Sequence, residues 1–206
     1  MVETIRAAAV REHLSHVATG LRSVRIEAVE AAASEVLSAY RRGRCIYVIG
    51  NGGSATTATH FACDLCKATI VEGTPRMRVI SLADNIALLT AWANDTAYER
   101  IFAEQLLNLA RAGDVVIAFT VSGRSPNVLA AMAVARERGA RTVAFLGLRS
   151  PASLERRVDV AVHVPSDDFR VVEDCHLALA HAITASTVQA VLTCPVGTDG
   201  GRDPAR

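Results

Sequence analysis

A histidine and an aspartate are four residues apart in a stretch of helical composition, ATTATHFACDLCKA, at residues 55–68. Because a helix brings residues four apart onto one face, His60 and Asp64 are expected to point in the same direction. An imidazole and a carboxylate at this spacing suit two ligands of one metal ion, or an acid and base pair. Taken alone, the pair is better explained as an exposed helix surface that has no chemical role.

A second polar group interrupts an apolar stretch, VVEDCHLALAH, and contains Glu173, Asp174, His176 and His181. At about 100° per residue, Asp174 and His181 are nearly in line on a helix, and Glu173 is about 80° from His181. Either acid can therefore share a pocket with that histidine. Polar groups in so apolar a helix need partners, which the helix at 55–68 would supply in the same chain or in a neighbouring copy. A structural network of ion pairs is the alternative.

Two turns rich in glycine and hydroxyl groups follow predicted strands. The first, GNGGS at residues 50–54, leads into a helix, and its small residues let backbone N–H groups and the positive helix end face an anion. The second, TVSGRSP at 120–126, carries the hydroxyl groups of Thr120, Ser122 and Ser125. Because open parallel sheets bind ligands at the carboxyl ends of their strands, the two turns together predict a phosphate or sugar-phosphate site.

Neither turn has the sequence of a common nucleotide-binding loop. The first turn is not followed by Gly-Lys-Ser/Thr, so it is not a P-loop, and it lacks the full G-x-G-x-x-G spacing of a dinucleotide-binding fold. Nucleotide binding is therefore disfavoured. Glycine and serine are also common in strand-to-helix turns, so each turn alone has a purely structural interpretation as well.

The elements that must position these groups alternate along the chain. Short apolar, β-branched runs predict five buried parallel strands, at residues 45–50, 77–82, 114–120, 141–147 and 160–164. Helical stretches separate them, which predicts an α/β fold with three α/β/α layers. One or two helices are expected at residues 4–42 and a long final helix at 169–192. Gly113 and Gly139 are expected at helix C-caps.

Length, composition and charge favour a compact enzyme domain. Half of the 206 residues are hydrophobic, and 22 basic and 21 acidic residues give a formal net charge of +1. No global field would therefore attract nucleic acid or a membrane surface, and neither is an expected partner. The N-terminus carries charges where a signal peptide needs an apolar run, and no membrane-spanning stretch is expected, so we expect a cytoplasmic protein. Residues 1–192 are predicted to form one domain and 193–206 a disordered tail.

The chain contains five cysteines at uneven spacing, Cys45, Cys63, Cys66, Cys175 and Cys194. An odd number without a regular pattern argues against a disulfide framework, so reduced thiols are expected. Cys63 and Cys66 form a C-x-x-C motif, but no second pair follows at zinc-finger spacing. We expect both to be packed in the core.

Four segments together resemble the phosphoheptose isomerases of the sugar isomerase (SIS) superfamily. They are GNGGS with His60 in ATTATHFACDL, then AWANDTAYERIF, then TVSGRSPNV, and the two histidines five apart in VEDCHLALAH. The resemblance extends from the N-terminal helices to about Leu192. It implies a five-stranded parallel sheet between helices and a homo-oligomer, usually a homotetramer with active sites at subunit interfaces, to which helices at 4–42 would contribute.

The resemblance also implies an activity. Members of this family convert sedoheptulose 7-phosphate to D-glycero-D-manno-heptose 7-phosphate through an enediol, and some bind zinc. The family pattern would make Asp64 the base and His181 its partner acid or base. The implied Zn²⁺ ligands are His60, Asp64, Glu173 and His181. The implied substrate-binding residues are Asn51, Gly52, Gly53, Ser54, Asp95, Thr120, Ser122, Ser125 and Glu173.

Three positions depart from the family pattern. Asp64 replaces a glutamate, Glu173 replaces a glutamine ligand and Val121 replaces a threonine of the phosphate turn. Aspartate is one methylene shorter, which sets the base back unless the helix or a metal compensates. Glu173 adds a negative charge, which suits a divalent cation. The changes also fit an isomerase that acts on another sugar phosphate.

Other functions remain as alternatives. One bacterial relative of this family is a non-catalytic adaptor that binds the DNA-replication initiator protein, but an adaptor has no need for the acid and base pair of Asp64 and His181. A sugar-phosphate sensor of this fold would be expected to carry a fused DNA-binding or effector domain, and none is expected here. An aldolase or dehydratase that uses the same metal pocket is a further alternative.

Overall fold

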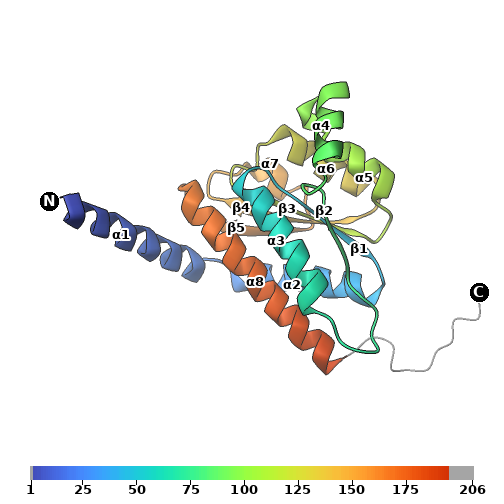
Figure 1. Cartoon of the computed structure of the whole chain (residues 1–206), viewed down its shortest axis with the longest axis horizontal. Helices are drawn as coiled ribbons and strands as arrows, with labels where there is room; N and C mark the ends of the chain where they lie inside the picture. The colour runs from blue at the N-terminus through green and yellow to red at the C-terminus, as the bar shows by residue number, and fades with distance from the viewer. Residues whose placement is uncertain (1, 195–206) are drawn as a thin grey trace, which may run out of the picture.

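A five-stranded parallel sheet forms the centre of the molecule (Figure 1). The computed structural model describes the backbone of residues 2–194 and the side chains of residues 8–194. The strands lie in the order β2-β1-β3-β4-β5. Their bounds are Cys45–Ile49 (β1), Arg78–Ser81 (β2), Val115–Thr120 (β3), Arg141–Gly147 (β4) and Val160–Val164 (β5). All five predicted strands are confirmed, with ends within one residue.

The position of each strand in the sheet explains its sequence. Every residue of β1 and β3 is buried, because both strands are central and are covered on both faces. Their sequences are therefore continuous apolar runs. β2 forms one edge and alternates between exposed and buried residues. The register, Ile46 opposite both Val79 and Val115, brings the carboxyl ends of β1, β2 and β3 to the same edge of the sheet.

Helices cover both faces of the sheet, as the α/β prediction requires (Figure 1). One layer consists of α2 (Ile26–Arg41), α3 (Gly53–Ala68) and α8 (Phe169–Thr193). The other consists of α5 (Ala103–Leu109), α6 (Pro126–Glu137) and α7 (Ala152–Glu155). α1 (Val2–Arg22) contacts α8 and extends away from this body. α4 (Ile86–Asp95) projects from a different side of the molecule and contacts the short helix η1 (Tyr98–Arg100).

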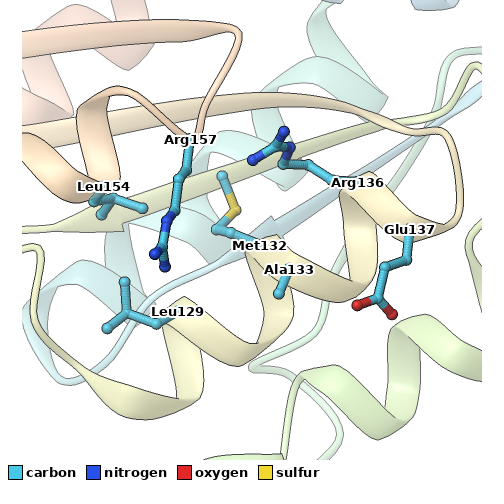
Figure 2. Close-up of a pocket in the computed structure, with 7 residues that line it drawn as sticks. All are labelled: Leu129, Met132, Ala133, Arg136, Glu137, Leu154 and Arg157. Carbon is cyan, nitrogen blue, oxygen red and sulfur yellow. The ribbon is translucent and has the colours of Figure 1, made fainter.

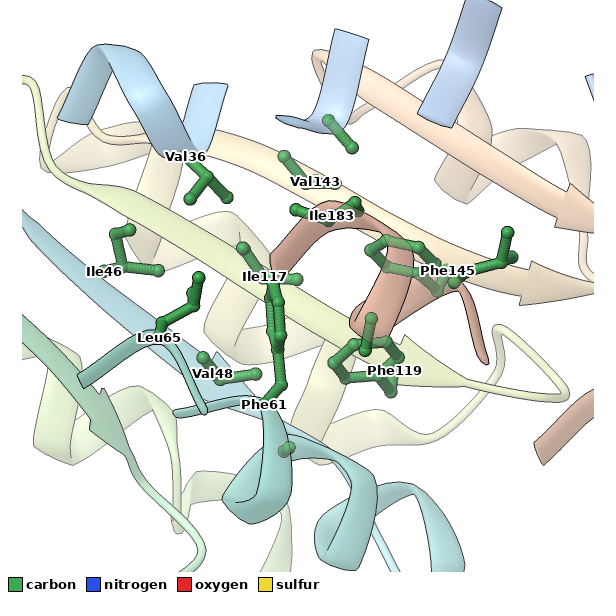
Figure 3. Close-up of a cluster of buried hydrophobic side chains, with 14 of the residues drawn as sticks. Val36, Ile46, Val48, Phe61, Leu65, Ile117, Phe119, Val143, Phe145 and Ile183 are labelled. Carbon is green, nitrogen blue, oxygen red and sulfur yellow. The ribbon is translucent and has the colours of Figure 1, made fainter. Parts of the chain in front are cut away.

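Each layer buries its own apolar cluster against the sheet. Figure 3 shows the cluster under α3 and α8, in which Phe61, Leu65 and Ile183 pack on Phe119 and Phe145 of the strands. The rings of Phe119 and Phe145 are stacked, with centroids 4.7 Å apart. The cluster on the other face is built around the side chains of Ile101, Phe102, Leu106, Met132 and Leu154. Both layers are therefore held to the sheet by hydrophobic burial.

The two predicted glycine caps have different outcomes. Gly139 has φ +74° and follows the last residues of α6, which confirms the C-cap. The prediction for Gly113 was wrong, because α5 already ends at Leu109 with extended backbone at Ala110. Asp114 explains the early end, since its carboxylate accepts a hydrogen bond from the backbone N–H of Arg111 at 2.8 Å and closes a turn. Gly113, at φ +87°, belongs to that turn.

The prediction that Cys63 and Cys66 are packed in the core was also wrong. Both are exposed on α3, because Phe61, Ala62 and Leu65 occupy the side of the helix that faces the sheet. The Cys66 thiol contacts the backbone oxygen of Val79 on the edge strand at 3.5 Å. All five cysteines are free.

The long helix α8 departs from expectation in a different way. By length and composition it is apolar enough to cross a membrane, which the sequence analysis expected of no segment. It lies along the sheet beside α2 and α3, and 44% of its most apolar window is buried. These contacts are those of a core helix. It extends to Thr193, and residues 195–206 of the predicted tail lie outside the described residues.

Candidate active site

The two polar turns lie at a point where the chain leaves the sheet in opposite directions. β1 and β3 are neighbours, but β1 leads into α3 on one face and β3 leads into α6 on the other. Their carboxyl ends therefore border a crevice, which is the usual ligand site of an open α/β sheet. Residues 50–54 and 120–126 form the two sides of this crevice.

The first turn requires glycine for geometric reasons. A Cβ at Gly50 would be 2.4 Å from the backbone oxygen of Ser54, and Gly52 has φ +56°. The tight turn lets α3 begin directly at Gly53, with the buried Ser54 in its first turn. The free N–H groups and the positive end of α3 therefore face the crevice, as an anion site needs.

The second turn arranges hydroxyl groups around a short backbone bend. The Thr120 hydroxyl oxygen accepts from the N–H of Gly123 at 3.2 Å, and that of Ser122 accepts from Arg124 at 3.2 Å. Ser125 is the N-cap of α6 without a side-chain cap bond. Because a hydroxyl that accepts one bond can still donate its own hydrogen, all three can donate to phosphate oxygens.

A cavity of about 300 Å³ connects the two turns with the start of α8. Its walls include six of the predicted substrate-binding residues: Asn51, Ser54, Thr120, Ser122, Ser125 and Glu173. Gly52 and Gly53 form the adjoining start of α3. Asp95 lies elsewhere, as the exposed last residue of α4, where its carboxylate accepts from the Asn94 amide at 2.8 Å.

Glu173 is the acid that faces this cavity. Its carboxylate lies directly over Gly53, where an added Cβ would be 2.2 Å from Oε2. Burial, and to a lesser degree the charge of Asp174, raises the pKa of Glu173 above its ordinary value. Asp174 points away, with its Oδ2 2.8 Å from Nε2 of His13 on α1. The choice between the two acids, which the sequence left open, therefore falls on Glu173.

A second group of polar side chains lies further along the same two helices. His60 and Asp64 of α3 meet His181 of α8, and one ligand atom from each lies within 4.8 Å of the others. Asp64 Oδ2 is 3.4 Å from His60 Nε2 and 3.5 Å from His181 Nε2, and the two imidazole nitrogens are 3.1 Å apart. All three side chains are partly accessible to solvent. The i, i+4 spacing predicted the pair of His60 and Asp64, and the family resemblance added His181.

This group is suited to a divalent metal. Two imidazoles and one carboxylate are the three protein ligands that a catalytic zinc site uses, with one position left for water or substrate. The structure brings together three of the four predicted ligands. The fourth, Glu173, is not part of the group and instead forms the cavity wall over Gly53. Its role as a ligand stays a prediction.

The sequence grouped His176 with the other polar residues of α8, but its surroundings differ. It is 1% exposed and packs against the rings of Phe119 and Phe145 at centroid distances of 5.8 and 5.9 Å. Neither ring nitrogen has a hydrogen-bond partner among the side chains and backbone of residues 8–194. Burial lowers the pKa of His176 to about 4, so the ring is neutral at physiological pH.

Three residues near the phosphate turns were not predicted. Phe119 and Phe169 contribute apolar walls to the cavity, and Asn127 of α6 bonds to Asn51. A polar residue directly after Pro126 at a helix start is a signal that a search for turn partners would have found. The aromatic residues offer no comparable signal, because their positions fit an apolar core equally well.

A larger cavity, of about 460 Å³, lies between α6 and α7 on the opposite layer (Figure 2). Leu129, Met132 and Leu154 form its apolar part, and the charged ends of Arg136 and Arg157 flank them. Glu137 also lines it, but no histidine or cysteine of the described residues does. The group of His60, Asp64 and His181 lies outside this cavity, along α3 and α8.

Comparisons with known proteins identify relatives of this chain. A family model described as SIS domain matches residues 9–147. The phosphoheptose isomerase of Geobacter sp. (strain M21) is 39% identical over 183 residues, which cover 89% of this chain and 93% of that protein. The probable phosphoheptose isomerase of Thermoplasma acidophilum is 34% identical over 175 residues, 85% of this chain and 95% of that one. The solved structure of phosphoheptose isomerase GmhA from Neisseria gonorrhoeae matches with a TM-score of 0.82 at 27% identity, covering 92% of this chain and 100% of that chain.

Proposed function

The chain belongs to the SIS domain family and is a phosphosugar isomerase, and from this premise we propose that it converts sedoheptulose 7-phosphate to D-glycero-D-manno-heptose 7-phosphate. One observation carries the proposal: a hydroxyl-lined cavity and the group of His60, Asp64 and His181 lie along the same helix, α8. The cavity would bind the phosphate, and the group would act on the other end of the sugar.

The spacing along α8 supports a seven-carbon substrate. Glu173 at the cavity and His181 in the acid and base group are eight residues apart, which corresponds to about 12 Å along a helix. With carbon–carbon bonds of about 1.5 Å, an extended heptulose 7-phosphate spans about 10 Å from phosphorus to C1. A triose or tetrose phosphate would be too short to reach both ends.

The chemistry requires one proton to move between carbons and another to move between oxygens. We assign Asp64 as the base that removes a proton from C1 of the ketose, which gives an enediol, and returns it to C2. His181 would carry the proton from the C1 hydroxyl to the oxygen on C2. The short distances between Asp64 and both imidazoles support this pairing, since each group can hold the proton that the other releases. No atom is gained or lost in the overall reaction.

Zinc is the proposed cofactor, with His60, Asp64 and His181 as ligands from this chain. A divalent metal bound there would polarise the carbonyl oxygen of the sugar and stabilise the negative charge of the enediolate. The carboxylate and two neutral imidazoles would hold it with a net charge of +1, which favours an anionic substrate.

We further propose that the active protein is a homo-oligomer, in the cytoplasm, with a tetramer as the expected form. α4 exposes Ile86 and Leu88, and α1 exposes Val10 and Leu14. Such surfaces are typical of subunit contacts. Asp95, the last residue of α4, remains a predicted substrate-binding residue.

The test is incubation of metal-analysed protein with sedoheptulose 7-phosphate in D₂O, followed by NMR. Aldose formation with deuterium at C2 is expected, and Asp64→Asn and His181→Ala should each lower the rate by about 10²- to 10⁴-fold. Turnover of a different sugar phosphate would keep the isomerase and refute the heptose assignment. Binding without turnover of any sugar phosphate would favour the adaptor alternative, and carbon–carbon cleavage or loss of water would identify an aldolase or dehydratase.

A further inference from the structure

Two asparagine side chains join the turns on either side of the crevice. Asn51 follows β1 and Asn127 is the second residue of α6, 76 residues later. Asn51 Nδ2 donates to Asn127 Oδ1 at 2.9 Å, and Asn127 Nδ2 donates to Asn51 Oδ1 at 2.8 Å. Asn127 is 2% exposed, whereas Asn51 lines the cavity.

A backbone group determines which way both amides point. The N–H of Val128, which can only donate, bonds to Asn127 Oδ1 at 2.9 Å. The other end of this amide, Nδ2, must therefore face Asn51, and it requires an oxygen there. The Tyr98 hydroxyl also donates to the same Asn51 oxygen, at 3.1 Å. Neither amide can be turned over without losing several of these bonds.

This network leaves one hydrogen of the Asn51 amide group without a partner. Its oxygen accepts two hydrogen bonds, from Asn127 and Tyr98, and one hydrogen of its Nδ2 is donated to Asn127. No other side chain or backbone group among residues 8–194 takes the second hydrogen. Asn51 lines the cavity, so this unused hydrogen is the group that its side chain has left to offer to a ligand there. Oxygens of a phosphate or a sugar are the partners that a fixed donor selects.

We propose that Asn127 and Tyr98 are positioning residues, which hold the Asn51 amide as a donor toward the oxygens of the sugar phosphate. The inference rests on the proposed function for its substrate. The two residues act through Asn51 and do not themselves contact the reacting carbons. They also tie the start of α6 to the turn after β1, so that the two sides of the crevice keep a fixed separation.

In the pair of Asn51 and Asn127, each side chain both donates and accepts a hydrogen bond. A substitution that removes the donor of one partner therefore tests the positioning role. In Asn127→Asp, the ionised carboxylate has no donor, so one of its oxygens faces Asn51 Oδ1 without a hydrogen between them. A protonated carboxyl group has one donor and one acceptor in almost the same shape as the amide. Low pH protonates the new carboxyl group and should therefore restore the hydrogen bond to Asn51 that the substitution removes.

The experiment measures kcat and KM for the sugar phosphate between pH 5.5 and 8. At pH 8, Asn127→Asp is expected to raise KM about tenfold with a smaller change in kcat, because the loss is one of binding geometry. The ratio of variant to wild-type KM should fall toward about threefold or less at pH 5.5. Taking the ratio at each pH cancels the pH effects that the two proteins share. A ratio that is constant with pH, or equal to one throughout, overturns the proposal.

Two further variants keep the test decisive if Asn127→Asp does not fold. Tyr98→Phe removes only an exposed hydroxyl group, and it is expected to raise KM about two- to fivefold with unchanged thermal stability. Asn108→Asp makes the matched substitution at an exposed position of α5, outside the crevice, and should leave KM unchanged. Unchanged KM in Tyr98→Phe, or an equal rise in Asn108→Asp, contradicts a specific positioning role.

An NMR measurement separates this proposal from the substrate assignment. In ¹⁵N-labelled wild-type protein, the side-chain NH₂ groups of Asn51 and Asn127 should exchange slowly with water, and Tyr98→Phe should shift the Asn51 pair. Inorganic phosphate should shift the Asn51 pair further. If no sugar phosphate is turned over but these signals behave as described, the proposed function fails and the positioning role stands. Fast exchange of both amides in the wild-type protein overturns the positioning role whatever the substrate.

Discussion

The two helix layers differ in how completely their polar groups are paired. On the α5 and α6 side, Gln105 donates to the backbone oxygens of Leu82 and Ile101, and Asn127 bonds to Asn51 and Val128. On the α3 and α8 side, His176 has no partner within residues 8–194, and His60 and His181 retain contact with solvent. Paired polar groups fix a fold, whereas groups with unused bonding capacity are available to a ligand. The group that we propose as acid, base and metal ligands lies in this second layer.

The largest expected effect tests whether that layer alone is catalytic. His60→Gln is expected to abolish binding of the proposed zinc and to lower kcat/KM by roughly 100- to 1000-fold, because it removes one of the three proposed ligands. His163→Gln is the matched control: His163 of β5 lies 3.5 Å from Glu155 at the end of α7, away from the crevice. Metal analysis and steady-state kinetics on both variants are the measurements. Equal losses in the two would break the contrast between the layers.

Leu65→Ala and Leu106→Ala, each of which leaves a cavity in one layer, compare how the two layers contribute to stability and to activity. Leu65 of α3 and Leu106 of α5 are both fully buried, and Leu→Ala at either should lower the free energy of unfolding by about 3 kcal/mol. Leu65 adjoins Asp64 in the sequence, so its variant should also lose activity at temperatures where it is still folded. Denaturant unfolding and kinetics distinguish the two effects. Loss of activity in Leu106→Ala alone would reverse the assignment of layers.

The buried His176 should make the folded protein less stable in acid. Because the pKa of His176 is about 4 when folded and about 6.5 when unfolded, the unfolded chain binds the proton first between these values. Its contribution to stability is complete above pH 6.5, is reduced by about 2 kcal/mol at pH 5, and is lost further as pH falls toward 4. His176→Leu should flatten this part of the stability curve, as measured by urea unfolding from pH 7 to 4.5. If the free energy of unfolding of His176→Leu falls with pH as steeply as that of the wild type, other groups cause the loss of stability in acid.

The smallest effect concerns the charge in the phosphate cavity. Glu173→Gln removes a negative charge beside the predicted phosphate site, so inorganic phosphate should bind about five- to tenfold more tightly at pH 8. Since the pKa of Glu173 is raised, wild type and variant should converge as pH falls and Glu173 becomes neutral. Asp174→Asn, which removes the exposed acid paired with His13, should change affinity less. Calorimetric titration measures all three proteins, and a weaker affinity in Glu173→Gln would contradict a repulsive role for this charge.

Sequence reasoning recovered the framework of the molecule because its signals are local. Buried parallel strands appear as continuous apolar runs, and the i, i+4 spacing of His60 and Asp64 is set by one helix. The resemblance to known isomerases extended this to His181. Errors arose where a neighbour decides the outcome: the side chain of Asp114 ended α5 before Gly113, and the burial of other residues left Cys63 exposed.

The contacts that sequence reasoning missed join residues that are distant in the chain. Helical geometry left Glu173 and Asp174 equivalent, and the choice depends on His13, which is 161 residues from Asp174. The pair of Asn51 and Asn127 spans 76 residues. No single-sequence pattern specifies such pairs, because they exist only once the sheet order brings two turns to the same edge.

The place of α8 in the chain has a consequence for how the enzyme is made. His60 leaves the ribosome 121 residues before its contact His181, and β1 pairs with β3 only after β3 has been synthesised. A nascent chain that ends before Phe169 therefore has both turns but lacks His176 and the other α8 side chains that pack near Phe119 and Phe145. A sheet face that is only partly covered favours aggregation. Synthesis of the final helix thus both covers the sheet and brings His181 to His60 and Asp64.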